Sequence, residues 1–242
     1  MKKLLLVGLL TLAMAIAAFA DIPHVTKSAM NEAIVPHGSG GATGTCSIIY
    51  YNMCSGWLWT WSGWLAGDEV GVVFDMPTDC GKIPGEPCTN TVFWWYWRYT
   101  TPGWGYTVTY NMYDATAQYC KTGPSYGTAT QDPTERWNYN LGLGGPSLSD
   151  LITLTATWDK GGLPRLGTDN NNKNYMAPVA CPGFTVGPIR TVYFGGLTTQ
   201  YCPPQYLADN WGPVQCLMDA EFFCGDIGTQ ESSWTGVKSL FR

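Results

Sequence analysis

The sequence is poor in histidine, with only His24 and His37, and both lie near its start. Ser-His-Asp and Cys-His catalysis need a positioned imidazole, so this class of enzyme is disfavoured. No glycine-rich loop follows a predicted strand and opens a helix, which excludes the common nucleotide-binding motifs. Zinc sites usually combine histidine with thiolate, and the cysteines here are better explained as disulfides, so no metal site is predicted.

Charge is also scarce. Charged residues make up 13% of the chain, and no cluster of Lys and Arg occurs. Phosphate backbones are bound by clustered basic side chains, so a nucleic-acid partner is excluded. After the first twenty residues no apolar run is long enough to cross a bilayer, and no long amphipathic helical pattern is present.

The first twenty residues have the pattern of a signal peptide. Lys2 and Lys3 precede an apolar run over 4–19, and Ala18-Phe19-Ala20 is a small-residue cleavage signal. Asp21 is then the first residue of the exported chain, which we expect to be secreted: periplasmic, extracellular or on the cell surface. We expect no membrane span in that mature chain.

Turn formers and aromatics dominate what remains. The chain has 29 glycines, 16 prolines and 14% aromatic residues, a composition typical of many short strands joined by tight turns. Alternation is clearest over 106–113 and 148–158, where one face is apolar and the other more polar. We therefore predict an all-β, antiparallel β-sandwich resembling a jelly roll and stapled by disulfides.

The predicted domain organisation is simple. Residues 21–44 contain few apolar side chains and form an extended or disordered lead-in. Residues 45–242 form a single sandwich-like domain, with a small separate unit after Gly183 as the alternative. Further strands are predicted over 47–51, 57–61, 68–75, 91–99 and 188–194, while 120–136 and 160–180 are predicted to be loops.

All nine cysteines follow the signal segment, and oxidising compartments favour their pairing. The best local pair is Cys80 with Cys88, because the residues between them include two Gly and two Pro that can reverse the chain. Cys216 with Cys224 has the same spacing.

The remaining pairings are open. Cys46 and Cys54 would be about 26 Å apart on a straight strand, whereas a disulfide needs Cα atoms within about 7 Å. They pair only if the chain turns between them. Cys181 and Cys202 could close a longer loop, which leaves Cys120 as the unpaired cysteine by elimination.

Two aromatic segments, 57–64 and 93–97, carry the main apolar mass and are predicted to pair or stack. Large aromatics usually form the core. In Phe93-Trp94-Trp95-Tyr96-Trp97, however, both faces of a strand are aromatic, so one face is free to meet a ligand. Aromatic rings stack on sugars, and the predicted ligand-binding residues are Trp59, Trp61, Trp95, Trp97 and Trp104.

Three functions fit this sequence. The first is a non-enzymatic module that binds polysaccharide or another extracellular ligand through an aromatic face. The second is a structural or adhesin-like assembly subunit. The third is a carboxylate-dependent hydrolase, for which the acids available are Asp68, Glu69, Asp75, Glu135 and Glu221. No cofactor is predicted, although the run from Asp169 to Asn174 resembles a weak Ca²⁺-binding turn.

Overall fold

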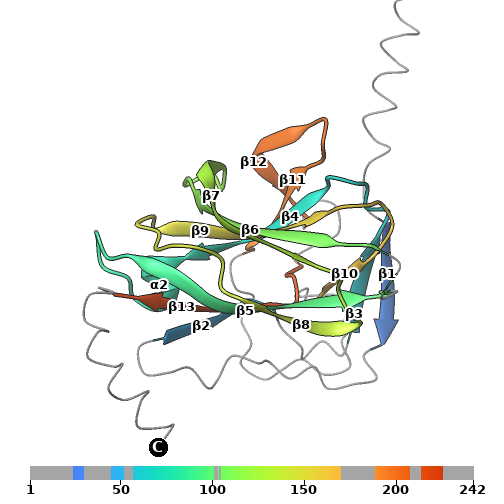
Figure 1. Ribbon diagram of the computed structural model, residues 1–242, viewed down its shortest axis with the longest axis horizontal. Coiled ribbons are helices and arrows are strands. Elements are labelled where there is room, and N and C mark those ends of the chain that lie inside the picture. The colour runs from blue at the N-terminus through green and yellow to red at the C-terminus, as the bar shows by residue number, and fades with distance from the viewer. Residues whose placement is uncertain are drawn as a thin grey trace, which may run out of the picture.

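The computed structural model describes residues 24–29, 45–51, 57–100, 103, 105–169, 189–207 and 214–225. The predicted signal segment and the C-terminal tail lie outside these ranges. The described chain forms two antiparallel sheets packed face to face, with one short helix (Figure 1). The predicted disulfide-stapled β-sandwich is therefore confirmed.

Sheet A contains seven strands. They are β1 (His24–Ala29), β2 (Thr45–Ile49), β3 (Trp57–Ser62), β5 (Cys88–Arg98), β8 (Arg136–Leu141), β10 (Arg165–Thr168) and β13 (Met218–Cys224). β8 lies along one edge of β5. On the other edge of β5, β10 pairs with residues 97–98 and β13 with residues 88–95, so the sheet forks there. One branch continues through β3 to β1, and the other ends at β2.

Sheet B contains six strands in the order β12, β11, β4, β9, β6, β7. Their bounds are β4 (Glu69–Asp75), β6 (Val108–Ala115), β7 (Lys121–Gln131), β9 (Leu151–Trp158), β11 (Thr191–Gly195) and β12 (Gln200–Tyr206). The chain changes sheet at most connections, from β3 to β4, from β5 to β6 and from β7 through β8 to β11. The helix α2 (Met76–Cys80) follows β4, and the Asp75 side chain caps it by accepting from the Thr78 amide.

The core between the sheets is a continuous stack of large aromatic rings. Trp64 stacks on Trp158 at a centroid separation of 4.1 Å, and Trp158 meets Trp97 edge-on at 5.4 Å. Trp97 in turn stacks on Trp95 at 5.7 Å. The two aromatic segments thus meet through Trp158 of sheet B, because β10 lies between β3 and β5.

The expected apolar face is confirmed in β6 and β9, two inner strands of sheet B. Val108, Tyr110 and Met112 of β6 are fully buried in the core, and so are Ile152 and Leu154 of β9. Burial raises the pKa of the Tyr110 hydroxyl, which also accepts a hydrogen bond of 2.8 Å from Trp97 Nε1.

The predicted cysteine pairing is wrong for both local pairs. Cys80 bonds to Cys46, and Cys88 bonds to Cys224. Antiparallel pairing of β13 with β5 places Cys224 directly opposite Cys88, and this register decides the bond. Cys216 is a buried free thiol, so the predicted bond between Cys216 and Cys224 does not form.

A third disulfide joins Cys120 to Cys202. Cys120 was expected to be unpaired and Cys202 to bond Cys181, so both expectations are wrong; Cys54 and Cys181 themselves lie outside the described residues. Three disulfides among the described residues are typical of secreted and cell-surface proteins.

The Cys120–Cys202 bond spans the outer face of sheet B. It connects the start of β7 to β12, although these strands lie at opposite edges of the sheet. In Figure 1 both rise from the sheet on the side away from sheet A. Beneath them Phe194 and Val73 are buried, and Lys121 forms an ion pair with the buried Glu69. The outer face of sheet B is therefore largely occupied by the chain itself.

The buried thiol predicts an alkaline limit to stability. Burial raises the pKa of Cys216 to about 12, so the folded chain keeps a proton that the unfolded chain releases near its ordinary pKa, about 8.5. Bound protons are then more numerous in the folded state, and stability falls as pH rises from about 9 toward 12, by up to about 1.4 kcal/mol per pH unit.

Urea titrations between pH 7 and 11 measure this slope. Cys216→Ala is expected to unfold with a shallower decline above pH 9 than the wild type. Equal slopes in the two proteins would contradict the assignment.

Candidate ligand-binding face

Four of the predicted ligand-binding tryptophans are core residues. Trp59 is 5% exposed, while Trp61, Trp95 and Trp97 are fully buried, so the expectation that they are solvent-exposed is wrong. Phe93, Trp95 and Trp97 of β5 point between the sheets, where sheet B covers them. Trp104 lies outside the described residues.

The opposite face of β5 carries a second set of aromatic side chains. Trp94 and Tyr96 point away from the core, and the register of β8 places Tyr139 beside Trp94 and Trp137 beside Tyr96. The rings meet edge-on, with centroid separations of 5.6 Å for the first pair and 5.3 Å for the second. Tyr51, which follows β2, contacts Trp137 at 5.9 Å. We call Tyr51, Trp94, Tyr96, Trp137 and Tyr139 the aromatic ladder.

Exposure increases along the ladder toward the edge of the sheet. Tyr51 and Tyr96 are buried, Trp94 and Trp137 are half-buried, and Tyr139 is 55% exposed. Cross-strand aromatic pairs stabilise a sheet, but an edge tyrosine this exposed still offers one ring face to solvent. The ladder therefore extends from the fork in sheet A, where its residues are buried, to the edge strand β8, where Tyr139 is exposed.

The buried end of the ladder is held rigidly. The Tyr51 hydroxyl donates a 2.5 Å hydrogen bond to Asp219 Oδ1 of β13. Burial, together with the nearby Asp219 carboxylate, raises the pKa of this hydroxyl well above its usual range, so it stays protonated and continues to donate. The Tyr96 amide donates to the Leu217 carbonyl at 2.9 Å where the sheet forks.

An ion pair closes one end of the ladder. Arg98, the next outward residue of β5, contacts Glu135 at 2.8 Å, and both side chains are partly exposed. The neighbouring Tyr99 is 44% exposed and lies under the guanidinium of Arg165, 4.4 Å from its ring centroid. At the other end Leu141, opposite Val92, is 72% exposed.

A cleft of about 440 Å³ adjoins the ladder. It lies between β7, the edge strand of sheet B, and β8, the edge strand of sheet A. Its walls are formed by Gly127, Thr128, Ala129, Thr130, Gln131, Tyr139, Asn140, Leu141, Gly142, Leu143 and Gly144. A Cβ on Gly144 would lie 1.9 Å from the Tyr126 carbonyl oxygen, so glycine is required where the two walls meet.

Four of the acids considered for hydrolysis have structural partners. The buried Asp68 accepts a 2.9 Å hydrogen bond from the Tyr193 hydroxyl, Glu69 pairs with Lys121, and Glu135 pairs with Arg98. Asp75 caps α2 and contacts Arg190.

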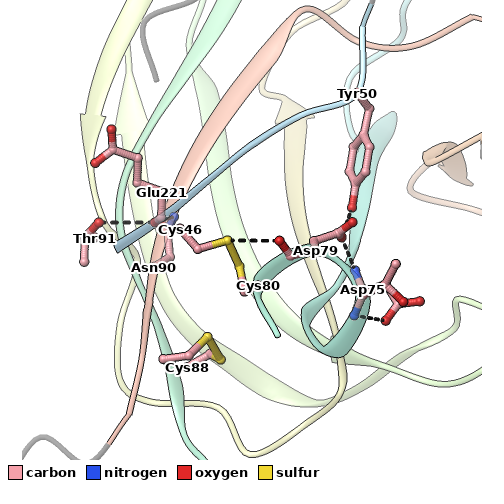
Figure 2. The surroundings of a disulfide bond; sticks show 11 residues. Cys46, Tyr50, Asp75, Asp79, Cys80, Cys88, Asn90, Thr91 and Glu221 are labelled. Carbon is pink, nitrogen blue, oxygen red and sulfur yellow. Dashed lines mark hydrogen bonds between the residues drawn. A yellow bond between two sulfur atoms is a disulfide. The ribbon is translucent and has the colours of Figure 1, made fainter. Parts of the chain in front are cut away.

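The surroundings of the Cys46–Cys80 bond show how such acids stabilise the fold (Figure 2). Asp79 accepts hydrogen bonds from the Tyr50 hydroxyl and from the Asp75 amide, which fixes α2 against the chain that follows β2. The backbone of Glu221, on β13, accepts from the side chains of Asn90 and Thr91.

Within the described ranges no group of three or more His, Cys, Asp or Glu side chains is placed to hold a metal ion. Asp169 accepts the Gln215 amide at 2.8 Å, and the rest of the predicted Ca²⁺-binding run lies outside those ranges. The described part of the chain also contains no helix that is long and apolar enough to span a bilayer.

The ladder residues were partly visible in the sequence. The aromatic character of both faces of 93–97 is what indicated an exposed face, but not which one. In Arg136-Trp137-Asn138-Tyr139-Asn140 the aromatics alternate with asparagines, a period-two signal of a strand. That segment was not assigned, and its partner was not predicted.

No family model matches the chain, and no curated protein matches it. Among solved structures, the fold is similar to that of the cysteine protease and lectin-like domains of Cwp84, a surface-layer-associated protein of Clostridium difficile. The TM-score is 0.50 at 6% identity, over 76% of this chain and 37% of that one. Another structure of this protease, after propeptide cleavage, has a TM-score of 0.49 at 7% identity, over 76% of this chain and 41% of its own. The chain thus spans well under two thirds of either neighbour, and the likeness concerns the fold alone.

Proposed function

We propose that this chain is a binding module of a secreted or cell-surface protein, and that it holds carbohydrate on the aromatic ladder. The observation that carries the proposal is the placement of the half-buried Trp94 of β5 beside the exposed Tyr139 of β8, the edge strand of sheet A. Stacking of a sugar ring on an aromatic face needs such a ring, accessible on one side and held by packing on the other.

Two further observations support this function. The outer face of sheet B is occupied by the chain under the Cys120–Cys202 bond, whereas on sheet A Trp94 is half-buried and Tyr139 is exposed. The structural neighbour from Clostridium difficile, whose structure includes a lectin-like domain, has a similar fold over 37% of its chain. The structural roles of the acids Asp68, Glu69, Asp75 and Glu135 give the hydrolase alternative less support.

Single substitutions at the exposed end of the ladder test the proposal. Trp94→Ala and Tyr139→Ala are each expected to weaken glycan binding about tenfold, since loss of one stacking contact of about 1.4 kcal/mol corresponds to that factor. Binding is measured by calorimetry against soluble polysaccharides and by pull-down on insoluble ones. Both variants are expected to fold, because the residues lie outside the core.

Tyr106→Ala is the matched control. Tyr106 is a half-buried tyrosine next to β6 of sheet B, and its loss is expected to leave binding unchanged. The proposal would be contradicted if Trp94→Ala, Tyr139→Ala and Tyr106→Ala all bound glycan with the same affinity. It would also be contradicted if the wild type bound no glycan. Release of reducing ends during the assay would favour the hydrolase instead.

A further inference from the structure

The cleft between β7 and β8 continues the surface of the ladder, and its chemistry specifies the kind of glycan. Resting on the proposed function, we infer that the ligand is an extended, uncharged glycan chain that lies across the ladder and enters this cleft. Tyr139 belongs to both surfaces, so a chain stacked on the exposed ladder reaches the cleft without a break.

The cleft walls carry no charge. None of the described residues that line it is Asp, Glu, Lys, Arg or His. Arg98, which follows the ladder on β5, and Glu135, which precedes β8, are paired with each other. A carboxylate or ammonium group entering the cleft would lose water without gaining a counter-charge, which is strongly unfavourable. A neutral sugar has no such cost.

The polar groups of the cleft suit hydroxyl partners. Thr128 Oγ1 donates to Asn111 Oδ1 at 2.7 Å, and Gln131 Oε1 lies 3.4 Å from the Tyr110 hydroxyl. These contacts orient the side chains while the Thr128 oxygen can still accept and the Gln131 amide nitrogen can still donate. Sugar hydroxyls both donate and accept, so they match this mixed set.

An added peptide strand fits the cleft less well. Asn138 Nδ2 donates to the Arg136 carbonyl at 2.9 Å, and Asn140 Nδ2 donates to the Asn138 carbonyl at 3.3 Å. Side chains of β8 thus occupy carbonyls of their own strand. Polar residues used in this way protect an edge strand from pairing with another chain.

The experiment compares neutral and acidic glycans. Neutral probes are oligosaccharides of glucose and of N-acetylglucosamine with two to six units, and acidic probes are polygalacturonate and alginate. We expect the neutral series to bind, with affinity rising with chain length and changing less than twofold between 50 and 500 mM NaCl, because no ion pair is formed.

Variants of the cleft separate this inference from the proposed function. Thr128→Val combined with Thr130→Val is expected to weaken binding of the six-unit probe roughly fivefold or more, from the loss of two hydroxyl partners. The change on the two-unit probe is expected to be smaller. Thr122→Val, an exposed threonine of β7 that does not line the cleft, is the control and should bind as the wild type.

Two results would overturn the inference while leaving the proposed function in place. The first is preferential, salt-dependent binding of an acidic glycan that Trp94→Ala still weakens about tenfold. This would leave the proposed function standing but show that the ligand is charged. Wild-type affinity of the cleft double variant for the six-unit probe would remove the cleft from the site. Failure of every glycan to bind would instead remove the proposed function together with this inference.

Discussion

Removal of the Cys88–Cys224 cross-link is expected to lower the free energy of unfolding by about 4 kcal/mol. The bond closes a loop of 136 residues, and a loop of this size greatly restricts the unfolded chain. The Cys120–Cys202 bond lies inside the loop and shortens its free length, so we place the effect below the value of nearly 5 kcal/mol for an unbranched loop. The variant is Cys88→Ala combined with Cys224→Ala, because a single substitution leaves a reactive thiol.

Urea denaturation and the melting temperature measure the loss. Cys216→Ala is the control, since it removes a buried cysteine that forms no disulfide. We expect it to cost about 1 kcal/mol, as for a small buried side chain. A double variant no less stable than Cys216→Ala would mean that the cross-link contributes nothing.

Trp97→Ala is expected to destabilise the fold by about 3–5 kcal/mol, the range for removing a buried aromatic side chain from a core. Trp97 links the two sheets: it stacks on Trp95, meets Trp158 edge-on and donates to the Tyr110 hydroxyl. Its loss leaves a cavity and deprives the buried Tyr110 oxygen of its donor.

Trp94→Ala on the same strand is the matched comparison. Trp94 is half-buried on the outer face, and we expect its removal to cost less than about 1.5 kcal/mol. Denaturant titrations of the two variants therefore report which face of β5 is the core. Equal losses would contradict the assignment of Trp94 to the ligand-binding face.

The sequence predicted the fold where one face of a strand is apolar and the other is wet. In β6 the period of two is uninterrupted from Val108 to Met112, and the faces could be assigned correctly. In β9 the apolar face was also assigned correctly, although Thr153 and Thr155 of its other face are buried too. β7 has no such pattern: its sequence, KTGPSYGTATQ, is polar on both faces because it lies at the edge of sheet B over a partly open cleft. Edge strands gain little from burial, so their sequences carry little periodic signal.

The cysteine pairs failed for a different reason. Each bond joins residues brought together by the tertiary fold, across separations of 34, 82 and 136 residues. Strand register decides the Cys88–Cys224 bond, whereas Cys80 lies in α2 and the Cys120–Cys202 bond links opposite edges of sheet B. Spacing along the chain favours short loops and contains no information on which strands become neighbours.

The candidate site was half predictable. The aromatic segment 93–97 indicated two aromatic faces, but only the packing of sheet B against Trp95 and Trp97 decides that Trp94 and Tyr96 face outward. The predicted ligand-binding residues Trp95 and Trp97 therefore lie on the correct strand, β5, but on the side that faces the core.

The disulfides also determine how the domain responds to a pulling force. Tension between Cys46 and Cys224 passes through two sulfur bridges, one bypassing the 34 residues from Cys46 to Cys80 and the other the 136 residues from Cys88 to Cys224. Only the stretch between Cys80 and Cys88 (88 − 80 = 8 residues) can be extended by the force. Its full extension increases the distance between Cys46 and Cys224 by about 30 Å at most. Every residue of the aromatic ladder lies within one of the two bypassed loops, so its backbone carries no load when the domain is stretched.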